Sequence, residues 1–164
     1  MSLKGRISIL SATAWGLSKS KICIAVAIDA FRNVVAVICG HGKPSSKRIK
    51  DALLSHIAPG PVIVHDKERS HPALVKAAKC TDESYKADVA DPAYLEAMKL
   101  VNSLCSWLRR YLFRFPGMKK ANLHSCLNWF VHLFRVRRDE GKWPKAARVL
   151  RHLLMSDSHY RSSW

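Results

Sequence analysis

Residues 21–40 read KICIAVAIDAFRNVVAVICG, and this stretch decides the fold class. Its two halves, 21–29 and 33–40, are rich in β-branched residues, which predicts two strands. Only Ala30-Phe31-Arg32 links them. We therefore expect an antiparallel hairpin.

Downstream of the hairpin, Pro44-Ser45-Ser46 opens a predicted helix. Apolar residues recur in this helix at helical spacing: Ile49, Leu53, Leu54 and Ile57. Residues 62–66 (VIVHD) predict a short buried strand that ends in a polar residue. A short helix is expected at 72–79, and the polar stretch 81–91 is expected to be a loop.

The C-terminal half is predicted to be helical. Asp91-Pro92 is a favourable helix start, since Asp accepts backbone N–H bonds and Pro suits the first helical position. The apolar stripe of this helix is expected to be Leu95, Met98, Val101, Cys105, Leu108 and Leu112. A second helix, 121–134, should bury Leu123, Leu127, Phe130 and Phe134, and a third, 143–155, should bury Trp143, Ala147, Leu150 and Leu154.

This order of elements predicts an α/β fold with a mixed sheet. The length of 164 residues fits one domain. We expect that domain to span residues 1–155, followed by a flexible tail at 156–164. No apolar run is long enough to cross a bilayer, so no membrane partner is expected.

Basic residues dominate the composition. Lys and Arg number 28 against 12 Asp and Glu, giving a formal net charge of +16. Such a field favours a polyanionic partner, and nucleic acid fits better than an anionic membrane surface because no separate basic amphipathic stretch is present. The basic residues concentrate in the predicted helical half.

The five cysteines are an odd number and form no Cys-x-x-Cys pair. That pattern argues against a disulfide framework and a zinc ribbon, and it favours buried thiols in a reducing cytoplasm. The apolar stretch that follows Lys4 and Arg6 is interrupted by hydroxyl residues, so we do not interpret it as a signal peptide.

Asp66 is the first candidate for chemistry, because functional groups of α/β sheets gather at the carboxyl ends of strands. A turn or capping role is an equal alternative. The neighbouring His65 is not expected to be a co-ligand, since adjacent strand residues face opposite ways. Asn102 and Arg109 lie seven residues apart on one helix face, where they could hold a metal or a phosphate or simply face solvent.

Asp29 closes the first hairpin strand. A third acid at a metal site is one interpretation, but a turn aspartate that binds backbone amides is favoured. The eight histidines show no ligand spacing, and no phosphate-binding glycine loop is present.

Several segments in order resemble the ISXO-type insertion-sequence transposases. In the C-terminal half they are 101–109 (VNSLCSWLR), 115–123 (FPGMKKANL) and 127–130 (LNWF). The front half contributes 16–18 (GLS), 23–29 (CIAVAID), 42–45 (GKPS) and 64–66 (VHD). The resemblance covers nearly the whole chain, and its specificity comes from the ordered series rather than from any one motif.

The resemblance implies a ribonuclease-H-like fold with extra C-terminal helices and DNA transposition by Mg²⁺-dependent phosphodiester chemistry. Asp66 would be the second metal-binding acid, Asn102 the third metal position, and Arg109 would replace a lysine that contacts DNA. Further DNA contacts would come from basic residues: Lys99, Arg110, Arg114, Lys119 and Lys120. The parent proteins' partners are DNA and, by implication, other transposase subunits.

Two departures from that family matter. Its opening strand carries an Asp-Glu pair before a Ser-x-Lys-Gly segment, and here Ser2-Leu3-Lys4-Gly5 follows Met1 directly. The first strand and its catalytic acid are therefore expected to be missing, either with residues 6–10 refilling the gap or with a frayed sheet. Arg109 keeps the charge of the usual lysine but changes the donor geometry.

Three functions follow from these observations. The first is a transposase-like protein that binds DNA and lacks strand transfer. The second is a non-enzymatic basic nucleic-acid-binding protein on the same fold. The third is an active nuclease in which Asp29 lies within about 5 Å of Asp66, since two catalytic metals need bridging carboxylates.

Overall fold

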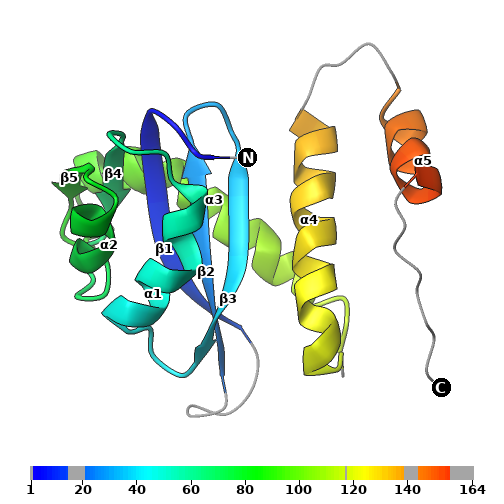
Figure 1. Ribbon diagram of the computed structural model, residues 1–164, viewed down its shortest axis with the longest axis horizontal. Coiled ribbons are helices and arrows are strands. Elements are labelled where there is room, and N and C mark those ends of the chain that lie inside the picture. Colours follow the sequence, from blue (N-terminus) through cyan, green and yellow to red (C-terminus); the bar gives the residue numbers. More distant parts are fainter. Residues whose placement is uncertain (1, 15–20, 117, 139–143, 156–164) are drawn as a thin grey trace.

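The computed structural model describes residues 2–14, 21–116, 118–138 and 144–155 (Figure 1). The strands are β1 (Arg6–Ala14), β2 (Ile22–Asp29), β3 (Val34–His41), β4 (Val62–His65) and β5 (Thr81–Ser84). The helices are α1 (Ser46–Leu53), α2 (Pro72–Ala77), α3 (Pro92–Leu112), α4 (Leu123–Arg138) and α5 (Lys145–Met155), with 3₁₀ turns η1 (Leu54–His56) and η2 (Lys120–Asn122).

The strands form one mixed sheet of five, in the order β3-β2-β1-β4-β5. β2 and β3 pair antiparallel, as the hairpin pattern predicts, and β1 pairs antiparallel with β2. β4 runs parallel to both of its neighbours, β1 and β5. The predicted α/β class and mixed sheet are thus confirmed.

β1 occupies the centre of the sheet. Its residues Ile7 to Ala14 pair with β2, and Arg6 to Ser8 pair with β4. Residues 6–10, expected either to take a place in the sheet or to fray, are paired as part of β1, which continues to Ala14. Because a central strand pairs on both sides, no gap of unsatisfied backbone groups is left there.

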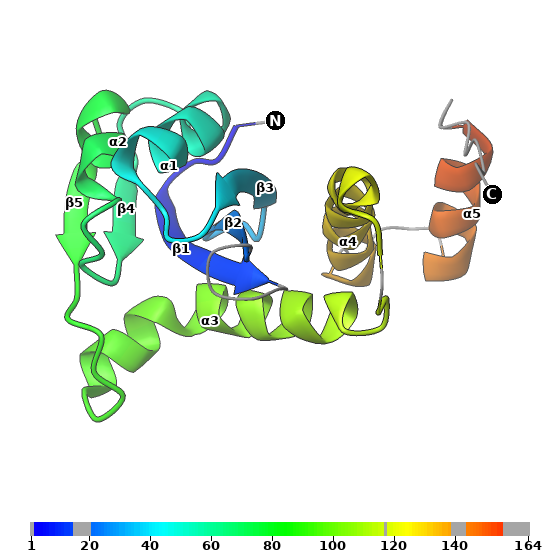
Figure 2. The ribbon, with the colours of Figure 1, turned by 90° about the horizontal axis from the view of Figure 1, so that it is seen from below.

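Helices cover both faces of the sheet (Figure 2). On one face, α3 and α4 bury a cluster that includes Met98, Leu108 and Phe130 against β2 and β3. On the other, α1 and α2 pack over Ile7, Ile9 and their neighbours. α3 begins as predicted, with the Asp91 side chain accepting from Ala93 N and Pro92 in the first turn.

Some expected positions are wrong. Residues 81–91 are not all loop, because Thr81–Ser84 forms the edge strand β5. Leu54 and Leu95 lie off the apolar faces, 36% and 46% exposed, because the helical turns that carry them point these side chains away from the sheet. The remaining predicted stripe of α3 and all four predicted apolar residues of α4 are buried.

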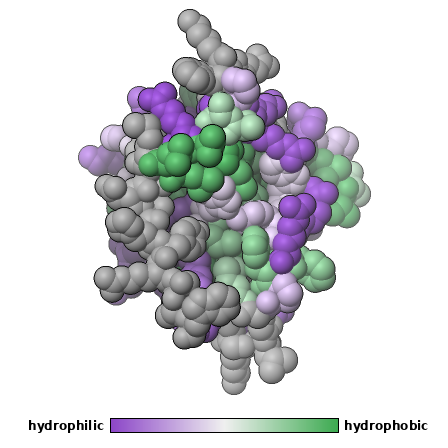
Figure 3. Space-filling view, turned by 90° about the vertical axis from the view of Figure 1, so that its right-hand side faces the viewer, coloured by the Kyte–Doolittle hydropathy of each residue, from purple (hydrophilic) through white to green (hydrophobic). Residues whose placement is uncertain are grey.

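α5 contacts α4 and stands apart from the sheet (Figure 1). Leu150 and Leu154 are 56% and 76% exposed, so their predicted burial is wrong: α5 has no second layer to pack against among the described residues. Apolar surface lies on this side of the molecule between hydrophilic side chains (Figure 3). The predictions for Trp143, Gly117 and the tail at 156–164 concern positions outside the described residues.

Among the described residues, no helix is both long enough and apolar enough to cross a bilayer.

Candidate functional site

Asp66 immediately follows β4, at the carboxyl end of that strand. β4 and β1 pair in parallel, with Ser8 beside Val64. Continuing this register by two residues places Leu10 beside Asp66. β1 reads RISILSATA and contains no acid, so the strand next to Asp66 offers it no carboxylate partner.

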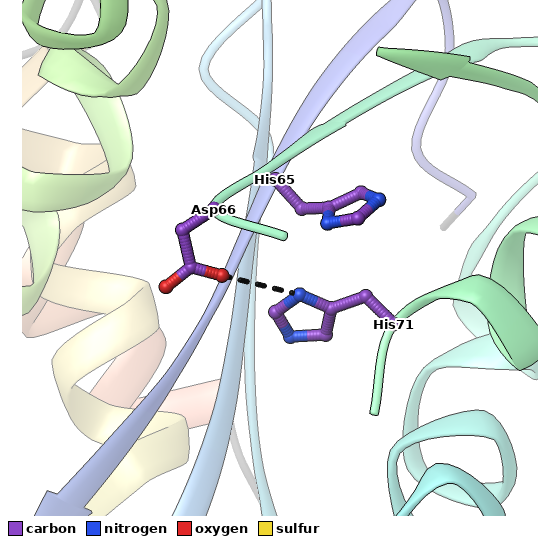
Figure 4. A group of neighbouring side chains, drawn as sticks. All are labelled: His65, Asp66 and His71. Carbon is purple, nitrogen blue, oxygen red and sulfur yellow. Dashed lines mark ion pairs between the residues drawn. The ribbon is translucent and has the colours of Figure 1, made fainter. Parts of the chain in front are cut away.

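Asp66 instead meets two histidines (Figure 4). His65 ends β4 and His71 precedes α2, and one ligand-type atom from each of the three residues lies within 4.8 Å of the others. His71 Nδ1 is 3.4 Å from Asp66 Oδ1. Asp66 Oδ1 also accepts a 3.3 Å hydrogen bond from Glu68 N.

Burial and neighbouring groups shift the pKa values of both Asp66 and His65. Burial works to raise the pKa of Asp66, but the contact with His71 and hydrogen bonds from backbone N–H groups together hold that pKa below its ordinary value. Burial, followed by the charge of His71, lowers the pKa of His65. The site thus combines a carboxylate with a neutral imidazole at pH 7.

His65 lies in this cluster, although its side chain was expected to face away from that of Asp66. The alternation of side chains holds only within a strand, and β4 ends at His65. Lys67 has a positive φ of 59°, which turns the chain sharply and returns it toward His71. The sequence offered no spacing signal for His71, because the loop rather than a helix brings it to Asp66.

Asn102 and Arg109 lie on α3, at the flank of its buried stripe. Asn102 is half-buried and Arg109 is exposed. Among the hydrogen bonds and ion pairs of the described chain, none joins either residue to Asp66, whose polar side-chain partners are His71 and Glu68 N. Their catalytic assignment therefore stays a prediction.

The predicted DNA-contacting residues are all exposed: Lys99, Arg110, Arg114, Lys119 and Lys120. Lys99 forms a 3.1 Å ion pair with Glu96, and Lys120 contacts the His41 ring. Arg109 and Arg110 occupy the last turn of α3, where cations also stabilise the helix dipole. These exposed cations are available to an anionic partner.

Asp29 is a turn residue. It is fully buried, and its oxygens accept from Asn33 N and Asn33 Nδ2, both at 2.8 Å, and from Lys4 N at 3.3 Å. Asp29 pairs with Ile7 of β1. Ile7 and Leu10 are three residues apart, so the distance between them along β1 is already about 10 Å. Asp29 and Asp66 therefore do not share a metal, and the favoured turn interpretation fits the contacts.

Replacing Asp29 with alanine is expected to lower the free energy of unfolding by about 2–4 kcal/mol, because three N–H groups lose a charged acceptor. Urea denaturation of the variant and the parent chain measures this. DNA affinity should stay unchanged. A stable variant that had lost DNA binding or nicking would instead assign Asp29 to function.

The donor set around Asp66 does not fit a pair of Mg²⁺ ions. Mg²⁺ prefers oxygen ligands in octahedral geometry, whereas this cluster supplies two imidazoles and one carboxylate. A two-metal site also needs bridging carboxylates, and β1 supplies none.

Comparison with solved structures identifies the fold. A chain of the simian T-cell lymphotropic virus intasome in complex with PP2A regulatory subunit B56 gamma superposes with a TM-score of 0.57 at 11% identity, over 96% of this chain and 56% of that one. The chain has a ribonuclease H-like fold. An identity of 11% supports a shared fold and nothing finer. This chain spans 56% of the length of the intasome chain that it matches.

The catalytic domain of the Mos1 mariner transposase is also matched, at 12% identity over 79% of this chain and 78% of that one, with a TM-score of 0.39. No family model and no curated protein matches the sequence of this ribonuclease H-like chain.

Proposed function

We propose that this chain is a transposase-like protein that binds DNA and does not cleave it. The observation that carries the proposal is the composition of β1: it fills the central position of the sheet and pairs with β4, yet it contains no acid to stand beside Asp66. Without that carboxylate, the metal-assisted activation of a nucleophile has no two-ion site to occur in.

The binding half of the proposal rests on charge. A net charge of +16 favours phosphate neutralisation and counterion release. In this proposal Arg109, Arg110, Arg114, Lys119 and Lys120, which we call the α3–α4 basic cluster, contact phosphates together with Lys99. In the same proposal, Asp66 and Asn102 correspond by resemblance to metal-binding positions of the ISXO-type transposases.

DNA binding and nicking by the purified chain, at several salt concentrations and with or without Mg²⁺, test the proposal. We expect binding without metal, an affinity that falls linearly with the logarithm of salt concentration, and no nicks in supercoiled plasmid. The matched variant Asp66→Ala should behave like the parent chain.

Mg²⁺-dependent nicking that disappears in Asp66→Ala would overturn the non-cleaving assignment. Binding that is equally tight at high and low salt would overturn the phosphate-contact assignment. Tighter binding to single-stranded RNA than to duplex DNA would favour the alternative of a general nucleic-acid-binding protein on the same fold.

A further inference from the structure

The cluster at the end of β4 has features that a turn aspartate alone does not require. The Asp66 carboxylate and the His71 ring face each other (Figure 4), and one ligand-type atom of His65 lies within 4.8 Å of a ligand atom of each. Both histidines are only 1% exposed. Two imidazoles brought together out of solvent need a structural or chemical reason.

Each histidine has an outer partner on the nitrogen that faces away. His65 Nε2 donates to Asp82 Oδ1 at 2.9 Å, which leaves the lone pair on Nδ1. His71 Nε2 lies 3.4 Å from Ser11 Oγ and 3.8 Å from Glu68 Oε2. Metal-binding histidines in proteins have this arrangement, with the second nitrogen held by a carboxylate, carbonyl or hydroxyl group.

The inward nitrogen of His71 has no hydrogen bond. Its Nδ1 is buried, and at 3.4 Å from Asp66 Oδ1 it forms an ion pair without hydrogen-bond geometry. Buried polar atoms are nearly always hydrogen-bonded. The adjacent Ser70 Oγ is likewise buried without a hydrogen bond to the described residues.

The distance between the Asp66 and His71 ligand atoms is the one expected around a single small ion. Two ligands bound at about 2.1 Å in tetrahedral geometry are roughly 3.4 Å apart, and the His71 Nδ1 to Asp66 Oδ1 distance is 3.4 Å. On His65, a bound ion would replace the 3.2 Å hydrogen bond that Nδ1 accepts from Lys67 N. Three protein ligands leave a fourth position for water or substrate.

We propose that His65, Asp66 and His71 bind one transition-metal ion of the Zn²⁺ class, with Asp82 as the residue that positions His65. Imidazole ligands favour Zn²⁺, Co²⁺ or Ni²⁺ over Mg²⁺. This site goes beyond the proposed function, because it stands whether or not the chain binds DNA. The ion proposed for this cluster also differs from a catalytic Mg²⁺ pair.

Co²⁺ titration of the purified, reduced chain tests the site, because Co²⁺ substitutes for Zn²⁺ and absorbs visible light. We expect one ion per chain and a spectrum without a sulfur-to-cobalt charge-transfer band, since free cysteines such as Cys80 and Cys126 are not ligands here. Zn²⁺ should displace the Co²⁺, and millimolar Mg²⁺ should not.

Matched variants locate the ion. Asp66→Asn, His65→Ala and His71→Ala should each weaken Co²⁺ binding at least about tenfold, and Asp82→Asn about 10–100-fold through loss of the outer partner. His124→Ala, an exposed histidine on α4, should leave it unchanged. If an alanine variant fails to fold, Asp66→Asn still tests whether Asp66 binds the ion, because the amide is nearly the same size as the carboxylate.

Thermal unfolding supplies a second measurement. An ion that binds only the folded chain raises the Tm in proportion to the logarithm of its concentration, and Asp66→Asn should abolish most of that rise. Equal Co²⁺ affinity in the parent chain and Asp66→Asn, a thiolate spectrum, or no binding at all would each overturn the metal site. None of these results would alter the DNA-binding measurement.

Discussion

Replacing Ile9 with aspartate is expected to abolish cooperative folding. Ile9 is fully buried in β1, the central strand, and packs in the cluster beneath α1 and α2. The change removes apolar burial of roughly 2–3 kcal/mol and adds a buried charge that costs several kcal/mol more. A domain of this size is stable by only about 5–15 kcal/mol.

Circular dichroism through a urea series measures this loss. Val89→Asp is the matched control, because the same kind of change occurs at a loop residue that is 84% exposed and should alter stability by about 0.5 kcal/mol or less. Ile9→Val should lower the free energy of unfolding by about 0.5–1.5 kcal/mol. A folded Ile9→Asp chain would mean that residues 6–14 are not the central strand.

The hairpin and the long helix were predictable because their signals are local. β2 and β3 are rich in β-branched residues on either side of a short turn. Asp91-Pro92 marks the first turn of α3 by side-chain chemistry that needs no tertiary partner. The boundaries agree within a few residues for the same reason. Local chemistry therefore accounts for most of the elements.

The two strands that complete the sheet carry weaker signals. β5 reads TDES, which has no apolar face, and it becomes a strand only because β4 offers it a parallel partner at the sheet edge. The central strand β1 was expected only as a refilling segment, and its full length depends on pairing with both β2 and β4. Tertiary pairing rather than propensity decides both.

In the candidate site, too, some residues have a local sequence signal and others are brought in only by the tertiary structure. Asp66 was predictable from its place at a strand end. His71 was not, because the left-handed Lys67 and the loop after it bring that ring to Asp66 across sequence that has no periodicity. His65 was not expected to join the site, because adjacent side chains of a strand face opposite ways. β4 ends at His65, so this alternation does not extend to Asp66. Convergence of side chains from a loop cannot be inferred from spacing.

Neutralising the α3–α4 basic cluster is expected to remove most DNA affinity. A variant with glutamine at Arg109, Arg110, Arg114, Lys119 and Lys120 should bind duplex DNA about a hundredfold more weakly at 0.1 M salt, because each phosphate that is no longer neutralised keeps its condensed counterions. The slope of log affinity against log salt should become shallower by about 0.9 for each such phosphate.

A second variant separates location from net charge. Glutamine at Lys43, Lys47, Lys76, Lys79 and Lys86 removes the same five charges from exposed positions outside the cluster. If the cluster forms the DNA-binding surface, this control should weaken binding far less, since it removes only the long-range part of the field, which salt screens. Equal reductions in affinity for the two variants would show that affinity follows total charge, and the chain would then bind DNA without a defined face.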